Sequence, residues 1–135
     1  MRQAADSSVT IAALLEDHPS HHATAEALTA CKTTIAHVAA ETYSVLTRLP
    51  GPRRADATTV ATALAARLPS NYVALDASSC ASAPGRLAAA GVSGGATYDG
   101  LIALTALEHE LELISRDRRA ARSYRALGVH FELLE

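Results

Sequence analysis

Short apolar runs alternate with longer Ala- and Leu-rich stretches along the whole chain. The short runs predict strands at about residues 3–6, 34–37, 72–75, 111–115 and 129–134. The longer stretches predict helices at roughly residues 9–16, 20–31, 38–48, 55–67, 84–90, 97–109 and 117–126. Strands separated by helices favour a parallel sheet, because right-handed crossovers place the helices on its faces. The pattern therefore predicts an α/β fold. We expect a Rossmann-like, mostly parallel central sheet of about five strands with helices on both faces.

Composition narrows the class of protein. The 135 residues fit a single domain, 1–135, and 49% of them are hydrophobic while 19% are charged, which argues against disorder. No apolar run is long enough for a membrane helix, and the N-terminus lacks the apolar stretch of a signal peptide, so we expect a cytoplasmic protein without a membrane partner. Cys31 and Cys80 have no metal-ligand spacing and are expected to be reduced packing residues.

Positive charge is concentrated in one segment. The formal net charge is −2, which does not describe a general nucleic-acid binder. Five of the twelve Lys and Arg residues nevertheless fall close together, namely Arg116, Arg118, Arg119, Arg122 and Arg125. This segment is either an ordinary exposed helix face or a surface for phosphate groups, which arginine binds in a bidentate manner.

Two aspartates occupy equivalent places at the ends of strands. Asp6 follows the first predicted strand and Asp117 follows the fourth, and each precedes a helix. Either residue can simply be an N-cap. In a parallel sheet, however, both would also point into the crevice at the carboxyl ends of the strands, where ligands bind.

Two further acids lie on predicted helices. Asp99 comes two residues after Thr97, an expected N-cap, and its simplest role is interaction with the helix dipole. Glu41 lies about 60° from the apolar stripe of Val38, Val45 and Leu49, at about 100° per residue. A carboxylate so near the core needs an arginine, hydrogen bonds or a cation, and a salt bridge at the edge of the face would suffice.

Together the four acids suggest a metal site. Carboxylates gathered in one pocket repel each other unless a cation lies between them, and hard oxygen ligands select Mg²⁺ or Mn²⁺. Metal-assisted phosphoryl chemistry would then follow. We expect Asp6, Glu41, Asp99 and Asp117 to hold the metal, with Asp6 and Asp99 binding it directly.

Several stretches resemble the PIN-domain ribonucleases, and in particular the VapC-type toxins of bacterial toxin-antitoxin pairs. They are "ADSSVTIAALLEDHPSHHATAEAL", "ETYSVLTRLPGPRR", "GGATYDGLIALTALEHELELISRDRRAARSYRALGV" and the final "HFELL". The acidic pattern of the family maps onto Asp6, Glu41, Asp99 and Asp117, and hydroxyls of the family match Ser8 and Ser115. The first strand, "MRQAA", departs from the family because it is more polar than usual.

The resemblance implies a PIN-like fold and a Mg²⁺-dependent endoribonuclease that cuts tRNA or ribosomal RNA and so inhibits translation. It also implies a cognate VapB-type antitoxin and a homodimer. In this picture Arg116, Arg118, Arg119 and Arg122 would bind RNA phosphates beside the catalytic acids. The alternative is a catalytically silent PIN-fold module that engages RNA or an antitoxin through its acidic pocket, although four intact acids argue against it.

Other chemistries have weaker support in the sequence. "DSSVT" faintly resembles the nucleophile loop of haloacid dehalogenases, but that chemistry needs a lysine after a late strand, and the only lysine is Lys32. His18, His21 and His22 span a proline break that gives no fixed ligand geometry. Tyr43, Tyr72, Tyr98 and Tyr124 could stack on bases, with Tyr98 the best placed, but buried packing is the expected role.

Overall fold

Three parallel strands form the central sheet of the computed structural model, which describes residues 1–135. The order is β1 (Gln3–Ala5), β4 (Glu112–Ser115), β5 (Phe131–Leu133). The remaining strands, β2 (Thr34–Ile35) and β3 (Tyr72–Val73), pair with each other in a second parallel sheet. The α/β class and the parallel pairing are confirmed. The single sheet of about five strands is wrong, because β2 packs beside β1 without pairing with it.

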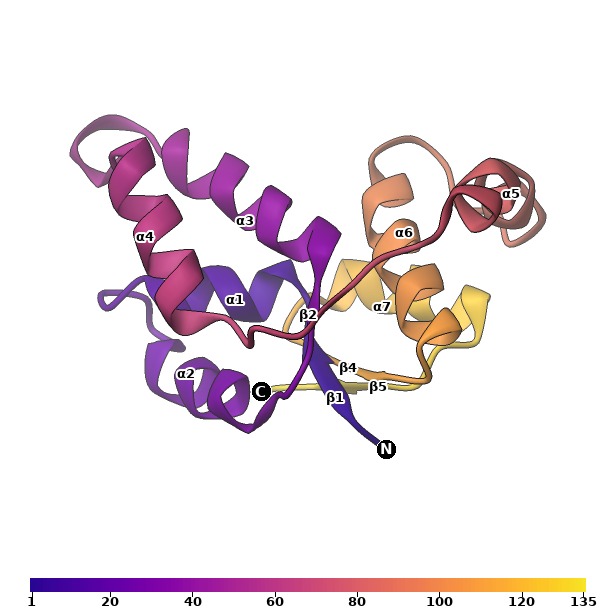
Figure 1. The fold of residues 1–135 in the computed structure, drawn as a ribbon, viewed down its shortest axis with the longest axis horizontal. Helices are drawn as coiled ribbons and strands as arrows, with labels where there is room; N and C mark the ends of the chain where they lie inside the picture. Colours follow the sequence, from indigo (N-terminus) through magenta and orange to yellow (C-terminus); the bar gives the residue numbers. More distant parts are fainter.

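Seven helices surround the strands, as predicted. They are α1 (Ser7–Leu14), α2 (His21–Ala30), α3 (Ala36–Thr47), α4 (Ala57–Arg67), α5 (Ala77–Ala89), α6 (Thr97–Glu108) and α7 (Arg118–Leu127), with short 3-10 turns at Gly51–Arg53 and Gly94–Ala96. Figure 1 shows α3 and α4 on one side of the molecule and α5 and α6 on the other, with the three-stranded sheet below them. None of these helices combines the length and apolar character needed to cross a lipid bilayer.

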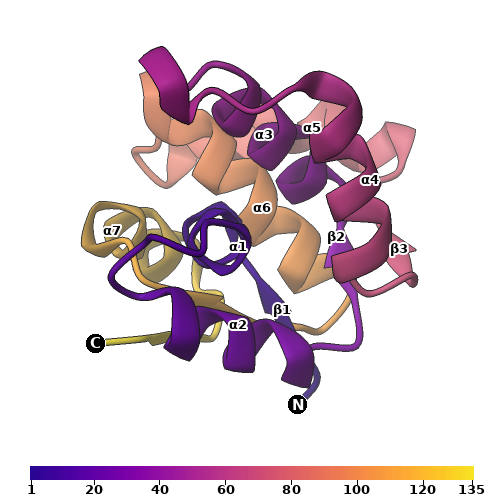
Figure 2. The ribbon, with the colours of Figure 1, turned by 90° about the vertical axis from the view of Figure 1, so that its left-hand side faces the viewer.

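The alternation of side chains along β1 and β4 divides the core in two. Ala4 and Leu113, which are paired in register, face a cluster that includes side chains of α3, α6 and α7. Their neighbours Ala5 and Ile114 face the opposite side, where α1, α2 and α4 contribute the apolar contacts. Helices therefore cover both faces of the sheet, and Figure 2 shows α1 between α2 on one side and α3 with α4 on the other.

The start of α5 departs from the prediction. The helix begins at Ala77 and not at residue 84, because Asp76 accepts a hydrogen bond from the backbone N–H of Ser79 at 2.7 Å and caps it. Pro84 therefore lies inside the helix, where a proline normally interrupts the hydrogen-bond pattern. Ala83 and Leu87 on this helix are buried against α6. At the contact, a methyl group on Gly100 would overlap the side chain of Leu87, so glycine permits the close approach of the two helices.

Strand pairing brings two distant segments to the same edge of the sheet. β1 and β4 are adjacent and parallel, so their carboxyl ends meet, and the backbone N–H of Asp6 donates to the carbonyl of Ile114 at 2.9 Å. The residues that follow β1 are therefore neighbours of those that end β4. This edge holds the first and last of the predicted acids.

Candidate active site

Asp6 lies at the end of β1 and caps α1, as its position in the sequence predicted. One carboxylate oxygen, Oδ1, accepts from the backbone N–H of Val9 at 3.3 Å and from the Ser8 hydroxyl at 2.6 Å. The other, Oδ2, accepts from the hydroxyl of Tyr124 at 2.7 Å. The side chain is buried, with 2% of the residue exposed. Burial raises the pKa of Asp6, and the hydroxyls of Ser115, Ser8 and Tyr124 oppose this rise by stabilising the charged form.

The two predicted hydroxyls join the ends of β1 and β4. Ser8 Oγ lies 3.4 Å from Ser115 Oγ and accepts from the backbone N–H of Arg116 at 2.9 Å. Ser115, which is completely buried, accepts in turn from the backbone N–H of Asp117 at 3.1 Å. These contacts hold the two segments that carry Asp6 and Asp117 in a fixed relation.

Asp117 caps α7, also as predicted. Its Oδ1 accepts from the backbone N–H groups of Arg119 at 2.9 Å and of Ala120 at 3.4 Å. The guanidinium Nε of Arg119 lies 3.9 Å from the same oxygen, but the arginine side chain is almost fully exposed, so this ion pair adds little to stability. Oδ1 of Asp117 thus caps the helix, while Oδ2 accepts no hydrogen bond from the protein.

Glu41 lies on α3 in a half-buried position, and its partner is a hydroxyl. The buried residues of this helix are Val38, Thr42 and Leu46, so the apolar face is centred slightly differently from the predicted stripe. The hydroxyl of Ser7, at the start of α1, donates to Glu41 Oε1. No arginine or lysine pairs with Glu41, so the salt bridge that would explain its position is absent.

Asp99 shows that the four acids lie close enough to influence each other. Burial, together with the charges of Glu41, Asp117 and Asp6, raises the pKa of Asp99 to about 6, while only Arg119 acts in the opposite direction. Asp99 lies in the first turn of α6, although the residue before the helix is Ala96 and not the expected Thr97. Four carboxylates from four separate segments therefore form one acidic centre.

The donor set of this acidic centre suits a hard divalent cation, because it consists of carboxylate oxygens with hydroxyls around them. The excess of negative charge that raises the pKa of Asp99 is also what a cation would offset. No three acidic, histidine or cysteine side chains lie at metal-ligating distances in this arrangement. Instead the protein's own hydroxyl and N–H groups occupy the oxygens of Asp6 and one oxygen each of Asp117 and Glu41.

The predicted arginines only partly surround the acidic centre. Arg116, Arg118 and Arg119 line an open cavity of about 400 Å³ together with Ser8 and Asp117. Arg116 Nη2 also donates to the hydroxyl of Ser20 at 3.3 Å. Arg122 is exposed on α7 and does not line this cavity. Arg125 lies over the ring of Phe131, 5.4 Å from its centre, and so packs along the other end of the helix.

Two residues that hold the acids, Ser7 and Tyr124, were not predicted from the sequence to have that role. Tyr124 is fully buried although α7 is rich in arginine, and it lies seven residues after Asp117, on the same face as Ala120 and Ala121. Its spacing on that helix face could have identified it as an inward-pointing hydroxyl. Ser7 directly follows Asp6, but nothing in the sequence connects it with Glu41, which is 34 positions away.

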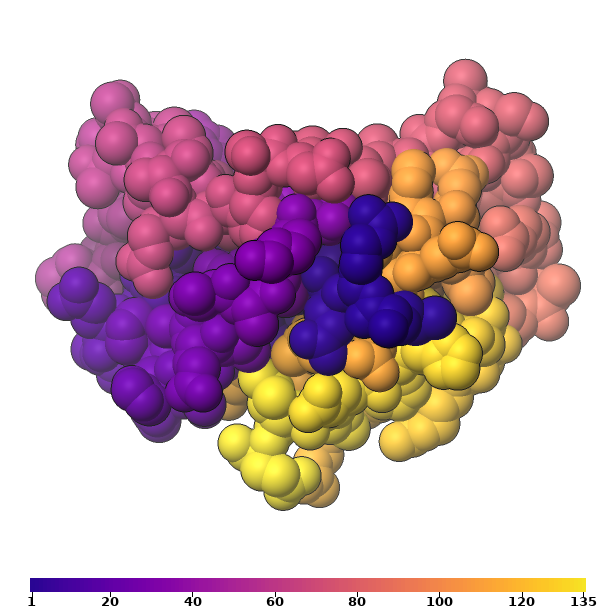
Figure 3. All heavy atoms as spheres, turned by 60° about the horizontal axis from the view of Figure 1, so that its bottom comes forward, coloured from indigo at the N-terminus to yellow at the C-terminus, as the bar shows by residue number.

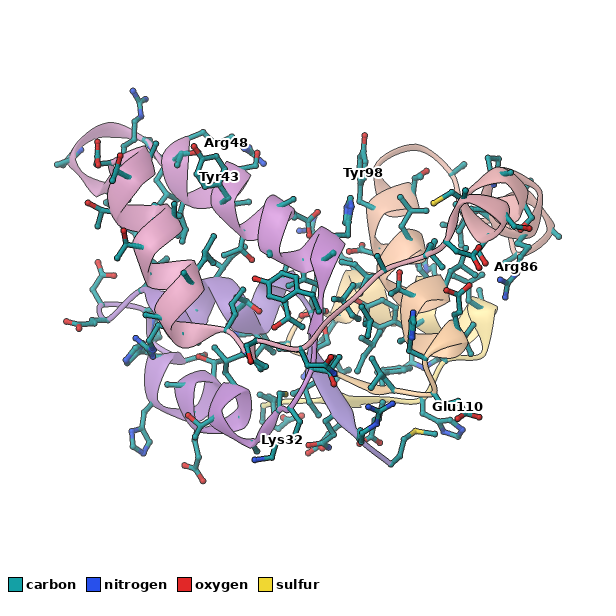
Figure 4. All side chains as sticks on the ribbon, in the orientation of Figure 1. Lys32, Tyr43, Arg48, Arg86, Tyr98 and Glu110 are labelled. Atoms are coloured by element: carbon teal, nitrogen blue, oxygen red, sulfur yellow. The ribbon has the colours of Figure 1, made fainter.

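The expectation that the tyrosines are packed in the core is wrong for three of the four. Tyr124 is buried, whereas Tyr43, Tyr72 and Tyr98 are 40%, 47% and 54% exposed. Tyr98 directly precedes Asp99 and projects near the start of α6 (Figure 4). The rival dehalogenase interpretation gains nothing from the structure, because Lys32 is exposed before β2 and projects from the lower edge in Figure 4.

Comparisons with known proteins point to one family. The family model described as "PIN domain" matches residues 4–126. Ribonuclease VapC40 of Mycobacterium tuberculosis is 45% identical over 131 residues, covering 97% of this chain and 98% of the relative. Ribonuclease VapC27 of the same species is 39% identical over 128 residues, covering 94% and 93%. The fold is similar to that in the crystal structure of VapBC2 from Rickettsia felis bound to a DNA fragment from their promoter, with TM-score 0.68, 16% identity and full coverage of both chains.

Proposed function

The chain belongs to the PIN-domain family, and from that premise we propose that it is a VapC-type endoribonuclease toxin whose activity depends on Mg²⁺. The observation that carries this proposal is the pairing of β1 with β4, which brings the segments of Asp6 and Asp117 to one edge of the sheet, where their charges and that of Glu41 act on Asp99. One PIN domain would comprise residues 1–135. The family resemblance noted in the sequence is confirmed by the family match and by the named relatives.

We assign the metal to the four carboxylates, with Asp6 and Asp99 as direct ligands and Glu41 and Asp117 binding directly or through water. When bound, a divalent ion would supply a water of lowered pKa and would offset charge on the scissile phosphate, and Mn²⁺ could replace Mg²⁺ in this role. The free Oδ2 of Asp117 and the raised pKa of Asp99 both fit a site that lacks positive charge.

The residues around the acids have separate tasks in this proposal. Tyr124 and Ser8 hold the Asp6 carboxylate in one orientation, and Ser7 does the same for Glu41. Ser115 fixes the turn between β4 and Asp117. Such support matters because catalytic groups lose efficiency when they are displaced by even a fraction of an ångström.

RNA is the proposed substrate, with tRNA or ribosomal RNA as the expected targets and inhibited translation as the result. Arg116, Arg118 and Arg119 line the cavity next to Asp117, where their guanidinium groups can bind phosphates on either side of the cut. Arg122, further along α7, would extend the same positive surface. In this proposal the arginines lie beside the acidic centre because they bind RNA phosphates while the carboxylates bind the metal.

The proposed partner that neutralises the toxin is a cognate VapB-type antitoxin. The resemblance to VapC-type toxins also implies a homodimer, which stays a prediction. An antitoxin segment that carries arginine would be complementary to the acidic centre.

The proposal is tested by incubating the purified protein with total RNA in Mg²⁺ or in EDTA and mapping the new RNA ends. We expect discrete cuts in Mg²⁺, none in EDTA, and none with Asp99→Asn. Asp99→Asn keeps the size of the side chain, so circular dichroism should show an unchanged fold. Cleavage that persists in EDTA or in the Asp99→Asn variant would refute the assignment of the acids.

A further inference from the structure

A second cavity adjoins the acidic centre. It measures about 300 Å³ and lies between α3 and the start of α6, lined by His37, Ala40, Glu41, Ser44, Arg48 and Tyr98. Glu41 belongs both to this cavity and to the acidic centre. Because of this shared residue, the cavity is an extension of the proposed active site and not a separate pocket. We call it the α3–α6 groove.

Two aromatic rings form one wall of the α3–α6 groove. The imidazole of His37 and the phenol of Tyr98 lie almost parallel, with an angle of 6° between their planes and 5.7 Å between their centres. Tyr98 is nevertheless 54% exposed, so its ring is only partly used for packing. Figure 4 shows Tyr98 projecting outward beside the ribbon of α6.

Each ring is carried by the same helix as one of the proposed catalytic acids, within about one turn of it. His37 precedes Glu41 by one turn of α3, and Tyr98 directly precedes Asp99 on α6. The two helices therefore hold the backbone of both aromatic residues near the carboxylates. Any flat group that binds against the rings is held next to the acidic centre.

The far end of the α3–α6 groove carries a positive charge. Arg48 follows α3 directly, and its Nε donates to the hydroxyl of Ser44 at 3.3 Å, which directs the guanidinium along the groove wall. The α3–α6 groove thus combines an aromatic surface, hydroxyl and carboxylate acceptors, and a cation within one cavity. A nucleotide presents the matching groups: a flat base, donors on the base edge and a phosphate.

We propose that Tyr98, backed by His37, is a stacking platform for one unpaired base of the RNA next to the cleavage site, and that Arg48 binds a phosphate of the same strand. This inference rests on the proposed ribonuclease function and deepens it. It identifies the substrate at this point as single-stranded, because a paired base would already be stacked between its neighbours. Tyr98 and Arg48 are then residues that determine which RNA segments can be cut.

The test uses mixed-sequence single-stranded oligoribonucleotides with 2-aminopurine at successive positions, bound to the full-length protein in EDTA so that no cleavage occurs. Stacking on an aromatic ring changes the fluorescence of this base. We expect one position to respond with the wild type and with Tyr98→Phe, and no position to respond with Tyr98→Ala. The affinity of Tyr98→Ala should fall about 5- to 150-fold, the range for one lost base stack.

Matched controls separate stacking from general effects. The control for Tyr98→Ala is Tyr43→Ala, which removes an exposed tyrosine that lies on α3 and does not line the α3–α6 groove. The control for Arg48→Ala is Arg86→Ala, which removes an exposed arginine of α5. Both controls should bind RNA like the wild type. An oligonucleotide without a base at the responding position should lose affinity for the wild type but not for Tyr98→Ala.

The outcomes distinguish this inference from the proposed function. If the wild type cleaves total RNA in Mg²⁺ but Tyr98→Ala binds and cleaves RNA as well as Tyr43→Ala does, the stacking platform is refuted and the ribonuclease stands. If Tyr98→Ala weakens only the binding of an antitoxin peptide, the α3–α6 groove is a protein site and the inference is overturned. If the wild type cleaves no RNA at all, the proposed function itself has failed.

Discussion

Three helices of this protein begin at an aspartate that follows a parallel strand, and the three carboxyl groups have very different surroundings. Asp6 follows β1, Asp76 follows β3 and Asp117 follows β4, and each accepts a hydrogen bond from a backbone N–H of its helix. Asp76 is exposed, and the backbone and side chain of Ser79 lower its pKa by hydrogen bonding. Burial raises the pKa of Asp6 instead.

The comparison shows that an ordinary helix cap and a cap that belongs to the acidic centre cannot be distinguished by local sequence. β1 and β4 are neighbours in the central sheet, so Asp6 and Asp117 approach each other and Asp99. β3 lies in the separate two-stranded sheet, so Asp76 meets no other acid of the cluster. The pairing of strands therefore decides which caps also contribute to an acidic centre.

The two ends of the central sheet also differ in the cavities and the acids that they carry. A cavity of about 520 Å³, larger than either cavity near the acids, opens at the amino end beside Met1, Arg2 and Leu111. Figure 3 shows this side, with the first residues of the chain lying on the surface between later segments. None of the four acids lines that cavity. Strand direction thus indicates the site better than cavity size does.

The largest expected effect is a difference in RNA cleavage between variants of two helix caps, Asp6 and Asp76. Asp6→Asn should reduce Mg²⁺-dependent RNA cleavage by more than about 100-fold, since a metal contributes several kcal/mol of charge stabilisation. Asp76→Asn should leave the rate unchanged. Asparagine caps helices as well as aspartate does, so both variants should keep their helices, as measured by circular dichroism. Equal activity of the two variants, measured as initial cleavage rates, would contradict the distinction.

A smaller effect concerns pH. Because the pKa of Asp99 is raised to about 6, the folded protein binds more protons than the unfolded chain between roughly pH 4 and 6. The metal-free protein should therefore gain stability as pH falls from 7 to 5. Thermal unfolding in EDTA should show a higher Tm at pH 5.5 than at pH 7 for the wild type, and a smaller difference for Asp99→Asn.

Two further observations sharpen the pH result. Asp99→Asn should unfold at a higher Tm than the wild type at pH 7 in EDTA, because it removes a negative charge that is partly buried and repelled by the other acids. Mg²⁺ binding should change in the opposite direction and weaken as pH falls below 6, because protons compete with the metal for the Asp99 carboxyl. A wild-type Tm that falls steadily from pH 7 to pH 5.5 would contradict a raised pKa of Asp99 in the folded protein.

The smallest expected effect concerns the arginines. Each phosphate contact should contribute about 0.7 to the slope of log affinity against log salt for single-stranded RNA. Arg119→Ala should flatten the slope by about that amount, whereas Arg86→Ala on α5 should not change it. Binding titrations at several salt concentrations measure this difference. Equal slopes would assign Arg119 to an ordinary exposed helix face.

Much of this fold could be predicted because the strands and helices have distinct apolar patterns. The division into two sheets could not, since β2 and β3 are only two residues long and pairing between distant segments leaves no local signal. The early start of α5 was missed because Pro84 suggests a first helical turn, while the cap at Asp76 stands before a serine-rich segment.

The candidate site was partly predictable for the same reason. Asp6 and Asp117 stand out as strand-end acids, and Glu41 stands out because it lies close to an apolar helix face. The supports of these acids come from other segments: Ser7 holds Glu41 and Tyr124 holds Asp6, across 34 and 118 positions. Only the three-dimensional structure brings such pairs together. The exposure of Tyr98 likewise depends on how α6 packs and not on the residues around it.

The most direct test of the central claim, that four carboxylates converge to hold a divalent cation, is Mn²⁺ binding followed by electron paramagnetic resonance. The wild type and Asp76→Asn should take up Mn²⁺ that Mg²⁺ displaces, while Asp6→Asn and Asp99→Asn should bind it far more weakly. The account would be contradicted if the wild type bound no Mn²⁺, or if Asp99→Asn bound it as tightly as Asp76→Asn does.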